Sequence, residues 1–239
     1  MKFLRSLELK KNRRREGLFV AEGPKVVGDL LRAGYQSRAM YSTLPRPDAQ
    51  LITEEELHRI SFLQHPQEVL AVMEIPAEHP FDMTLVKSSL VLALDGVQDP
   101  GNVGTIIRIA DWFGISTILC SPDTADVYNP KVVQATMGSL AHVHIIYIDL
   151  VELLQHADCP VYGTLLDGQN IYQQQLTPYG IIVMGNEGNG ISANVRQLIT
   201  QRLLIPNYHS GSETAESLNV AIATAITCAE FRRSCQYRV

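Results

Sequence analysis

Asn102 and Arg108 are the first pair of side chains in the sequence that could act on a bound ligand. They lie in LDGVQDPGNVGTIIRIADWFG (94–114), where a polar loop separates an apolar stretch from an apolar helical pattern. At about 100° per residue, Arg108 lies about 140° around the helix from the apolar stripe, so it cannot simply be a core residue. An isolated asparagine and arginine in this setting are more often a helix cap and a surface residue.

A second group of polar side chains stands among glycines in the stretch IIVMGNEGNGIS. Three glycines at positions 185, 188 and 190 let the backbone turn sharply and approach a ligand closely, while Asn186 and Glu187 supply an amide and a carboxylate. The spacing fits neither the Walker loop, which needs GK[ST], nor the dinucleotide fingerprint GxGxxG. A plain strand-to-helix turn is the alternative interpretation.

The third stretch, LLIPNYHSGSETAESLNVAIATAI, contains Ser217 and Asn219 just before an apolar helical pattern. Ser217 is a good N-cap residue, and a serine in this position is more often a cap than a catalytic group. Each of the three stretches follows an apolar strand pattern, which places all three at the carboxyl ends of strands. Ligands bind at that edge in open α/β sheets.

The elements that must position these loops alternate between strands and helices, which predicts an α/β fold with a buried parallel sheet. We expect strands at 90–95, 116–120, 144–148, 160–166, 180–185 and 202–206. We expect helices to begin at Asn102, Asn129, Asp149, Ser192 and Ser217.

A smaller α/β unit precedes this sheet. The pattern predicts a helix after Gly23-Pro24 that ends at Gly34, strands at 39–42 and 68–75, and a helix from a Thr53–Glu56 capping box through Ile60. Pro76 and Pro80 then mark a linker. We therefore expect a substrate-binding domain at 1–76, a linker at 77–88 and a catalytic domain at 89–239.

Positive charge is concentrated in the first part of the chain. The net charge of the 239 residues is −5, but residues 1–38 carry +6 and the remaining residues −11. Such a cluster is typical of phosphate binding, although a solvated basic terminus would look the same. The candidate RNA-binding side chains are Lys10, Lys11, Arg13, Arg14, Arg15, Lys25 and, in the second half, Arg108.

Composition excludes several other classes of protein. The four cysteines form no CxxC pair, and the seven histidines are scattered, so we expect neither a metal site nor a disulfide framework. No apolar stretch approaches the roughly 20 residues that span a bilayer, and no signal-peptide pattern is present. We therefore expect a cytoplasmic protein without a membrane contact.

Taken together and in this order, the motifs DPGNVGTIIRIADWFG, VMGNEGNGIS and IP followed by ESLNVAIATAI resemble the three signature motifs of the SpoU family of RNA 2′-O-ribose methyltransferases, in the SPOUT class. The resemblance covers residues 90–232, and RREGLFVAEGPKVVGDLL resembles the opening of the ribosomal-protein-like RNA-binding domain of that family. It implies a SPOUT-type parallel sheet with a C-terminal trefoil knot, S-adenosylmethionine as cofactor, an RNA substrate and a homodimer formed through the catalytic domain.

The resemblance also assigns roles to residues of this chain. The reacting ribose would be surrounded by Asn102, Arg108, Glu187, Ser217 and Asn219. The cofactor would be bound, largely through backbone groups, by Gly163, Thr164, Met184, Gly185, Asn186, Gly188, Ile205, Pro206, Ser217 and Leu218.

The implied reaction is an in-line attack of a ribose 2′-hydroxyl on the sulfonium methyl group. Arg108 is the residue to which the resemblance assigns catalysis, but a guanidinium stays protonated near neutral pH and is a poor general base. We therefore expect Arg108 to hold the adjacent phosphate and to stabilise the developing alkoxide. Asn102 and Ser217 would position the ribose or orient Arg108.

The chain departs from the family pattern in one place. Nine residues, 207–215, separate Pro206 from Glu216, about four more than usual, and in this loop Tyr208, His209 or Ser210 could touch RNA. A solvent-exposed loop is the alternative.

Three alternative functions remain at this point. They are a transfer-RNA 2′-O-ribose methyltransferase, a non-catalytic RNA-binding or ribosome-assembly protein of the same fold, and a nucleotide-dependent oxidoreductase. The basic N-terminal domain favours ribosomal RNA over transfer RNA. The complete set of polar motif residues disfavours a non-catalytic protein, and the missing early GxGxxG disfavours the oxidoreductase.

Overall fold

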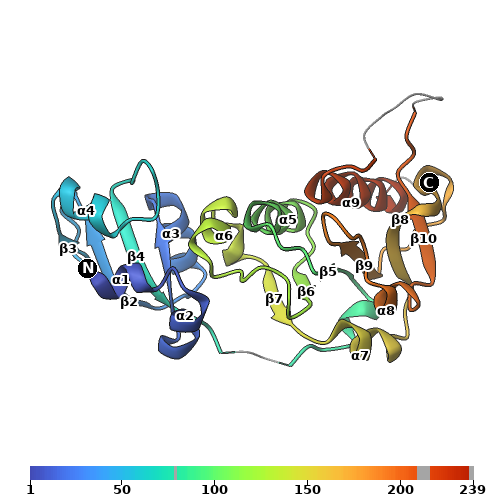
Figure 1. Cartoon of the computed structure of the whole chain (residues 1–239), viewed down its shortest axis with the longest axis horizontal. Helices are drawn as coiled ribbons and strands as arrows, with labels where there is room; N and C mark the ends of the chain where they lie inside the picture. Colours follow the sequence, from blue (N-terminus) through green and yellow to red (C-terminus); the bar gives the residue numbers. More distant parts are fainter. Residues whose placement is uncertain (78–79, 209–215, 237–239) are drawn as a thin grey trace. The chain divides into compact units, whose positions relative to one another are not determined.

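A six-stranded parallel sheet carries all three glycine-marked loops. In the computed structural model, which describes residues 1–77, 80–208 and 216–236, its strand order is β10-β8-β9-β5-β6-β7, and every neighbouring pair is parallel (Figure 1). The strands are β5 (Leu90–Asp95), β6 (Thr117–Cys120), β7 (His144–Tyr147), β8 (Val161–Asn170), β9 (Gly180–Gly185) and β10 (Gln201–Leu204). The predicted parallel α/β sheet is confirmed.

Helices cover both faces of this sheet. Helices α5 (Pro100–Trp112) and α9 (Val220–Gln236) pack together over one face, while α7 (Leu150–Gln155) and α8 (Ala193–Arg196) lie over the other (Figure 1). Two short 3₁₀ turns, η1 (Leu85–Lys87) and η3 (Ile171–Gln173), complete the unit. Strands β5 and β9 are buried along their whole length, as expected for central strands covered on both faces.

The chain divides into two compact units, and the division does not follow the sequence order. The first unit comprises residues 1–79 together with 126–142, and the second comprises residues 80–125 together with 143–239. The segment 126–142 joins β6 to β7 along the chain, yet it packs as part of the first unit. Contiguous sequence patterns give no sign of this division.

The first unit has a four-stranded sheet in the order β1-β4-β2-β3. Its strands are β1 (Leu18–Glu22), β2 (Ser37–Ser42), β3 (Gln50–Leu51) and β4 (Val69–Glu74). Its helices are α1 (Lys2–Ser6), α2 (Lys10–Glu16), α3 (Pro24–Arg32), α4 (Glu54–Ile60) and α6 (Pro130–Ala135), with a 3₁₀ turn η2 (Ser139–Ala141).

Strand β1 of this sheet is buried on both faces. Leu18 and Val20 join a core cluster with residues of α1 and α4. On the other face, the Phe19 ring lies 6.0 Å from that of Tyr35 and 4.8 Å from that of Tyr128, in the segment 126–142. Because all five residues of β1 are buried, the strand lacks the alternation that marks a half-exposed strand, and the sequence pattern did not predict it.

Several predicted helix starts are confirmed, and two are wrong by a few residues. Thr53 and Glu56 form the expected capping box, and Asn129 and Asp149 cap their helices. Helix α5 begins at Pro100, where Asp99 rather than Asn102 is the cap, and α9 (Val220–Gln236) begins three residues after the predicted Ser217.

Candidate active site

The carboxyl ends of β5, β8, β9 and β10 form one edge of the sheet, and the three predicted loops meet there. The loop after β9 is a tight turn closed by two backbone hydrogen bonds between Asn186 and Gly190, of 2.9 and 3.0 Å. The Asn186 side chain donates to the carbonyl of Gly96 at 2.7 Å and accepts from the backbone N–H groups of Gly188 and Asn189. One amide therefore fixes this loop to the loop that follows β5.

Gly185 is where the backbone comes closest to itself. A Cβ atom added there would lie 2.3 Å from the carbonyl carbon of Gly190 and 2.3 Å from the nitrogen of Ile191. Only a residue without a side chain fits this approach. The glycine requirement predicted from the sequence has a definite structural cause at this position.

A line of hydrogen bonds joins Asn219, Asn102 and Glu187. The Asn219 side-chain amide donates to Asn102 Oδ1 at 2.9 Å, and Asn102 Nδ2 donates to Glu187 Oε1 at 2.9 Å. Asn219 Oδ1 also accepts from the first N–H groups of α9, so Asn219, and not Ser217, is the capping residue of this helix. The three motifs are thus joined side chain to side chain.

Glu187 is held in its ionised form. Partial burial opposes ionisation, but hydrogen bonds from the side chain of Asn102, from its own backbone and from the backbones of Asp99 and Gln98 outweigh it and lower the pKa. The carboxylate accepts from the Gln98 and Asp99 N–H groups at 3.2 and 3.1 Å. It therefore also fixes the turn that leads into α5.

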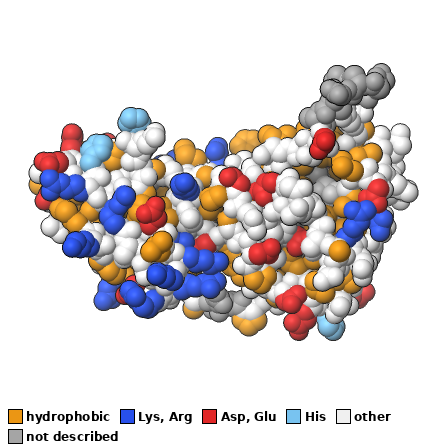
Figure 2. Space-filling model, in the orientation of Figure 1, with side chains coloured by type: hydrophobic (Ala, Val, Ile, Leu, Met, Phe, Trp, Pro, Cys, Tyr) orange, Lys and Arg blue, Asp and Glu red, His pale blue; other side chains and the backbone are white. Residues whose placement is uncertain are grey.

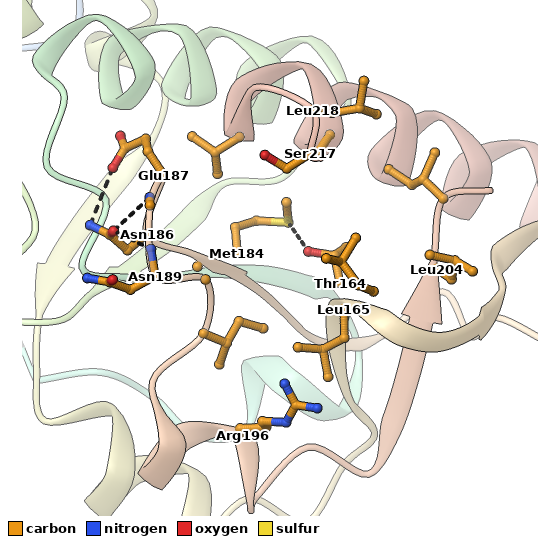
Figure 3. Close-up of a pocket in the computed structure, with 18 of the residues that line it drawn as sticks. Thr164, Leu165, Met184, Asn186, Glu187, Asn189, Arg196, Leu204, Ser217 and Leu218 are labelled. Carbon is orange, nitrogen blue, oxygen red and sulfur yellow. Dashed lines mark hydrogen bonds between the residues drawn. The ribbon is translucent and has the colours of Figure 1, made fainter. Parts of the chain in front are cut away.

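These loops enclose a pocket of about 420 Å³, a volume within the usual range for small-molecule sites. Figure 3 shows Met184 and Thr164 in its middle, the Asn186–Asn189 turn on one side and Leu204 on the other. The lining residues are Thr164, Leu165, Leu166, Asp167, Met184, Gly185, Asn186, Glu187, Gly188, Asn189, Gly190, Ile191, Arg196, Leu204, Ile205, Ser217, Leu218, Val220 and Ala223.

An irregularity in β8 shapes one wall of the pocket. Gly163 pairs with Arg202, but the next residue of β10, Leu203, pairs with Gln169, so the intervening residues of β8 leave the ladder. Residues 164–167 of this excursion line the pocket. Gly168 allows the chain to return, because a Cβ there would lie 2.5 Å from the carbonyl carbon of Leu203.

The sequence that forms this pocket, at the carboxyl edge of the parallel sheet, matches a known family of proteins. The model of the SpoU rRNA Methylase family matches residues 89–229. The chain belongs to the SpoU family. The model of an MRM3-like substrate binding domain matches residues 1–71.

Three proteins of known sequence or structure resemble this chain over nearly its whole length. The 23S rRNA (guanosine(2553)-2′-O)-methyltransferase RlmP of Bacillus subtilis is 32% identical over 93% of this chain and 91% of its own. A TrmH-family RNA methyltransferase structure from Porphyromonas gingivalis is 45% identical, with a TM-score of 0.85, over 97% of this chain and 96% of its own. An AdoMet-bound rRNA methyltransferase structure from Sinorhizobium meliloti is 31% identical, with a TM-score of 0.83, over 97% of this chain and 93% of its own.

The SpoU pocket brings together eight of the ten residues predicted to bind the cofactor. They are Thr164, Met184, Gly185, Asn186, Gly188, Ile205, Ser217 and Leu218. Gly163 and Pro206 are not among the lining residues. Gly163 instead makes room for the Ile199 side chain, because a Cβ at residue 163 would lie 2.2 Å from Ile199 Cδ1.

Sequence reasoning missed two charged lining residues. Arg196 and Asp167 line the pocket and form an ion pair with each other, and Arg202 donates to the same Asp167 carboxylate at 3.2 Å. Asp167 follows the predicted end of β8 at residue 166 by one position. To place Asp167 in the pocket, the sequence pattern would have had to reveal the irregularity of β8.

Of the residues predicted to surround the ribose, Arg108 alone lies apart from the connected group. Asn102, Asn219 and Glu187 are linked by hydrogen bonds, and Ser217 lines the pocket with Glu187. Arg108 is exposed on α5, does not line the pocket and has no hydrogen-bond or ion-pair partner among the described residues.

The basic residues predicted to bind RNA lie in the first unit, whose Lys and Arg side chains gather over its N-terminal helices (Figure 2). Lys11, Arg14 and Arg15 are exposed, whereas Lys10 is half-buried. Lys25 is exposed but pairs with Asp29 and donates to the carbonyl of Met137.

Arg13 departs from its expected role at the RNA surface. Its side chain is 1% exposed, pairs with Asp126 and donates to the carbonyls of Leu7 and Glu8. A guanidinium with these partners cannot reach a phosphate without breaking the first unit. The prediction for Arg13 is therefore wrong, and its role is structural.

Within residues 1–77, 80–208 and 216–236, no helix is long and apolar enough to cross a membrane. The same residues contain no group of three or more His, Cys, Asp or Glu side chains that could hold a metal ion. Tyr208, in the extended loop, is 86% exposed, while His209 and Ser210 lie outside the described residues.

Proposed function

We propose that this chain transfers the methyl group of S-adenosylmethionine to a ribose 2′-hydroxyl in ribosomal RNA. The observation that carries the proposal is the pocket at the carboxyl edge of the sheet. Next to it, the Asn219–Asn102–Glu187 hydrogen bonds join all three motifs. One relative, which matches over 93% of this chain and 91% of its own length, is named for 2′-O-methylation of 23S rRNA.

The pocket suits this cofactor. Apolar side chains such as Leu165, Leu204 and Leu218 offer surfaces for an adenine ring, and the backbone around Gly185 offers polar atoms where no side chain intervenes. When bound, S-adenosylmethionine supplies a methyl group activated by a sulfonium. The chain itself must then bind the ribose, exclude water and manage the hydroxyl proton.

Asn102 and Asn219 are placed to position the ribose. Asn102 is half-buried and Asn219 is exposed, and each has its orientation fixed by hydrogen bonds to the other and to Glu187 or α9. Pre-oriented amides of this kind align a hydroxyl without reorganising during the reaction. Ser217, on the pocket wall, adds a hydroxyl on the same side as Leu218 (Figure 3).

Arg108 is free to bind the RNA. Because it is exposed and has no partner among the described residues, its guanidinium can pair with the phosphate next to the reacting ribose and stabilise charge on the 2′-oxygen. Arg108→Lys should retain part of the turnover and Arg108→Ala very little. Near-wild-type turnover in both variants would contradict this role.

We further propose that the basic N-terminal unit binds the RNA, with residues 1–76 as the substrate-binding domain, 77–88 as the linker and 89–239 as the catalytic domain. Exposed Lys11, Arg14 and Arg15 support this assignment. The resemblance to the SpoU family also leads us to propose a C-terminal trefoil knot and a homodimer. A ribosomal RNA substrate would place the enzyme in the cytoplasm.

The decisive experiment follows labelled methyl transfer to separated ribosomal and transfer RNA from cells that lack this protein. We expect label in one ribosomal RNA, recovered as a 2′-O-methyl nucleoside and abolished by Arg108→Ala. Label in transfer RNA would overturn the substrate, and label in neither, with cofactor still bound, would favour a binding protein.

A further inference from the structure

A second cavity, of about 380 Å³, lies within the first unit and is remote in sequence from all three methyltransferase motifs. Its walls come from the start of α3, the residue after β2, one face of α4 and the loop before β4. The lining residues are Pro24, Thr43, Glu54, Leu57, His58, Pro66, Gln67 and Glu68. All of them belong to the substrate-binding domain matched over residues 1–71.

Backbone hydrogen bonds between its walls preform this cavity. The Thr43 N–H donates to the carbonyl of Glu68 at 2.9 Å, and the Gly23 N–H donates to the carbonyl of Val69 at 2.9 Å. Helix α4 is fixed at its start by the Thr53–Glu56 capping box. A cavity whose walls are joined in this way can select a ligand by shape.

Of the polar side chains that line the cavity, the Thr43 hydroxyl donates to the carbonyl of Glu68 at 3.5 Å, and four others have no side-chain partner among the described residues. Glu54, His58, Gln67 and Glu68 form no side-chain hydrogen bond or ion pair within the described residues. Pro24, Leu57 and Pro66 supply apolar surface between them. The lining thus combines flat apolar contacts, one aromatic ring and hydrogen-bond acceptors that are free to bind.

A metal ion does not suit this arrangement. In the part of the chain that the structure describes, no three His, Cys, Asp or Glu side chains converge closely enough to hold one, so the two glutamates and His58 do not form such a group. A phosphate is excluded by the two carboxylates. The two carboxylates and the apolar surface between them instead favour a planar group that donates hydrogen bonds at its edge.

We propose that this cavity binds an unpaired nucleobase of the RNA, with guanine preferred. This inference rests on the proposed RNA substrate. Proteins read single-stranded RNA by taking bases out of the stack, packing them on side chains and hydrogen-bonding their Watson–Crick edges. Guanine is the base with two adjacent donors on that edge, N1–H and N2–H₂, which can pair with both oxygens of one carboxylate. Glu54 or Glu68 supplies that carboxylate, and His58 and the prolines contact the ring.

The test compares binding of the full chain to RNA hairpins that share one stem and differ in a single bulged nucleotide. Guanosine, inosine, uridine or no bulge is used, and affinity is measured by fluorescence anisotropy at one salt concentration. Inosine lacks only the N2 amino group. We expect the wild-type protein to bind the guanosine hairpin about tenfold more tightly than the inosine hairpin, or about 1.4 kcal/mol.

The substitutions Glu54→Gln and Glu68→Gln distinguish guanine recognition by a carboxylate from a non-specific effect of charge on RNA binding. Removing a negative charge from a protein that binds phosphates should strengthen RNA binding. We expect the substitution at the reading carboxylate to weaken binding of the guanosine hairpin and to abolish its preference over inosine. The matched control is Glu74→Gln, at an exposed residue of β4 outside the cavity, which should leave the preference intact.

Equal affinity of the wild-type protein for the guanosine and inosine hairpins would overturn the proposal. A preference that survives both cavity substitutions would overturn it as well. Each protein is also assayed for methyl transfer to ribosomal RNA. Transfer by the wild-type protein without hairpin discrimination would refute the nucleobase site while leaving the proposed function in place.

Discussion

At Gly185 the backbone of β9 passes against that of Gly190 and Ile191, with no room for a Cβ. Gly185→Ala should push the Asn186–Gly190 turn away from the strand and deform the pocket wall. Because overpacking of this kind costs about 1–3 kcal/mol, we expect affinity for S-adenosylmethionine to fall at least about tenfold. Isothermal titration calorimetry would measure the change.

Gly28→Ala is the control for that experiment. Gly28 lies within α3, and the nearest atoms to an added Cβ belong to the flexible end of the Arg32 side chain, at 3.2 Å. The substitution should leave cofactor affinity unchanged and stabilise the helix by about 0.5–1 kcal/mol. Equal losses of cofactor affinity in both variants would mean that the effect is not specific to the close approach at Gly185.

Glu187 should act as a fixed carboxylate rather than as a proton acceptor. Its pKa is lowered by the hydrogen bonds that outweigh burial, so it stays ionised throughout the neutral range. Glu187→Gln should lower the methyl-transfer rate by about 10- to 100-fold by misplacing Asn102. The pH–rate profile between pH 6 and 9 should keep its shape, and a lost limb in the variant would show that Glu187 titrates there.

The same hydrogen bonds make the fold sensitive to acid. Because the pKa of Glu187 is lower in the folded than in the unfolded chain, ionised Glu187 stabilises the fold above its unfolded pKa. That contribution declines as the pH falls through the folded pKa. Wild-type protein should therefore lose more stability than Glu187→Gln when the pH is lowered below about 4.5, as measured by thermal unfolding.

For Asn102 and Asn219, the sequence predicts polar side chains at the site but not the hydrogen bonds that they form. The sequence pattern indicates Asn102 as a possible cap and Ser217 as the cap of the last helix. Asp99 and Asn219 take those positions in the structure. Residue type and spacing indicate that a helix starts nearby, but the choice among several capping residues depends on tertiary hydrogen bonds.

Helix α2 is joined to the segment 126–142 by the ion pair of Arg13 and Asp126. Asp126→Asn leaves the Arg13 guanidinium, 1% exposed, without a compensating charge. Loss of one partner of a buried pair costs about 3–5 kcal/mol, and we expect a corresponding fall in the free energy of unfolding of the first unit. Chemical denaturation followed by circular dichroism would measure it.

Arg14→Met provides the comparison, because Arg14 is exposed one position further along the same helix. It should change stability by less than about 0.5 kcal/mol and should weaken RNA binding instead. Reversed effects, with stability lost in Arg14→Met and RNA affinity lost in Asp126→Asn, would contradict the assigned roles.

The sheet of the second unit was predictable strand by strand, since each strand is a short apolar run bounded by turn residues. Strand β8 is the exception, because its excursion at residues 164–168 depends on pairing with β10. Asp167, within this excursion, was missed for the same reason. The RNA-binding prediction for Arg13 failed because charge counting does not distinguish a buried arginine from an exposed one.

In a single copy of the chain, large apolar side chains of the second unit are exposed to solvent. Trp112 is 85% exposed at the end of α5, and Ile222 is 53% exposed near the start of α9. Exposed aromatic and aliphatic groups often mark an association surface. They support the proposed homodimer.

Trp112 is the single tryptophan of the chain and therefore reports on its own environment. If it is covered in a homodimer, its emission maximum should shift to longer wavelength on dilution. Ile222→Arg should give a monomer by light scattering, with the emission of the diluted wild type. Emission and mass that do not change with dilution or with Ile222→Arg would place the dimer surface elsewhere.

Because residues 126–142 pack with residues 1–79 in the first unit, a chimera of two homologous enzymes must take both stretches from the same parent. A chimera that replaced residues 1–79 alone would separate Arg13 from Asp126 and Phe19 from Tyr128. The two stretches should therefore change together as homologous enzymes diverge, although nearly fifty residues of methyltransferase sequence separate them. Grafts that transfer both stretches should fold, and those that transfer one should not.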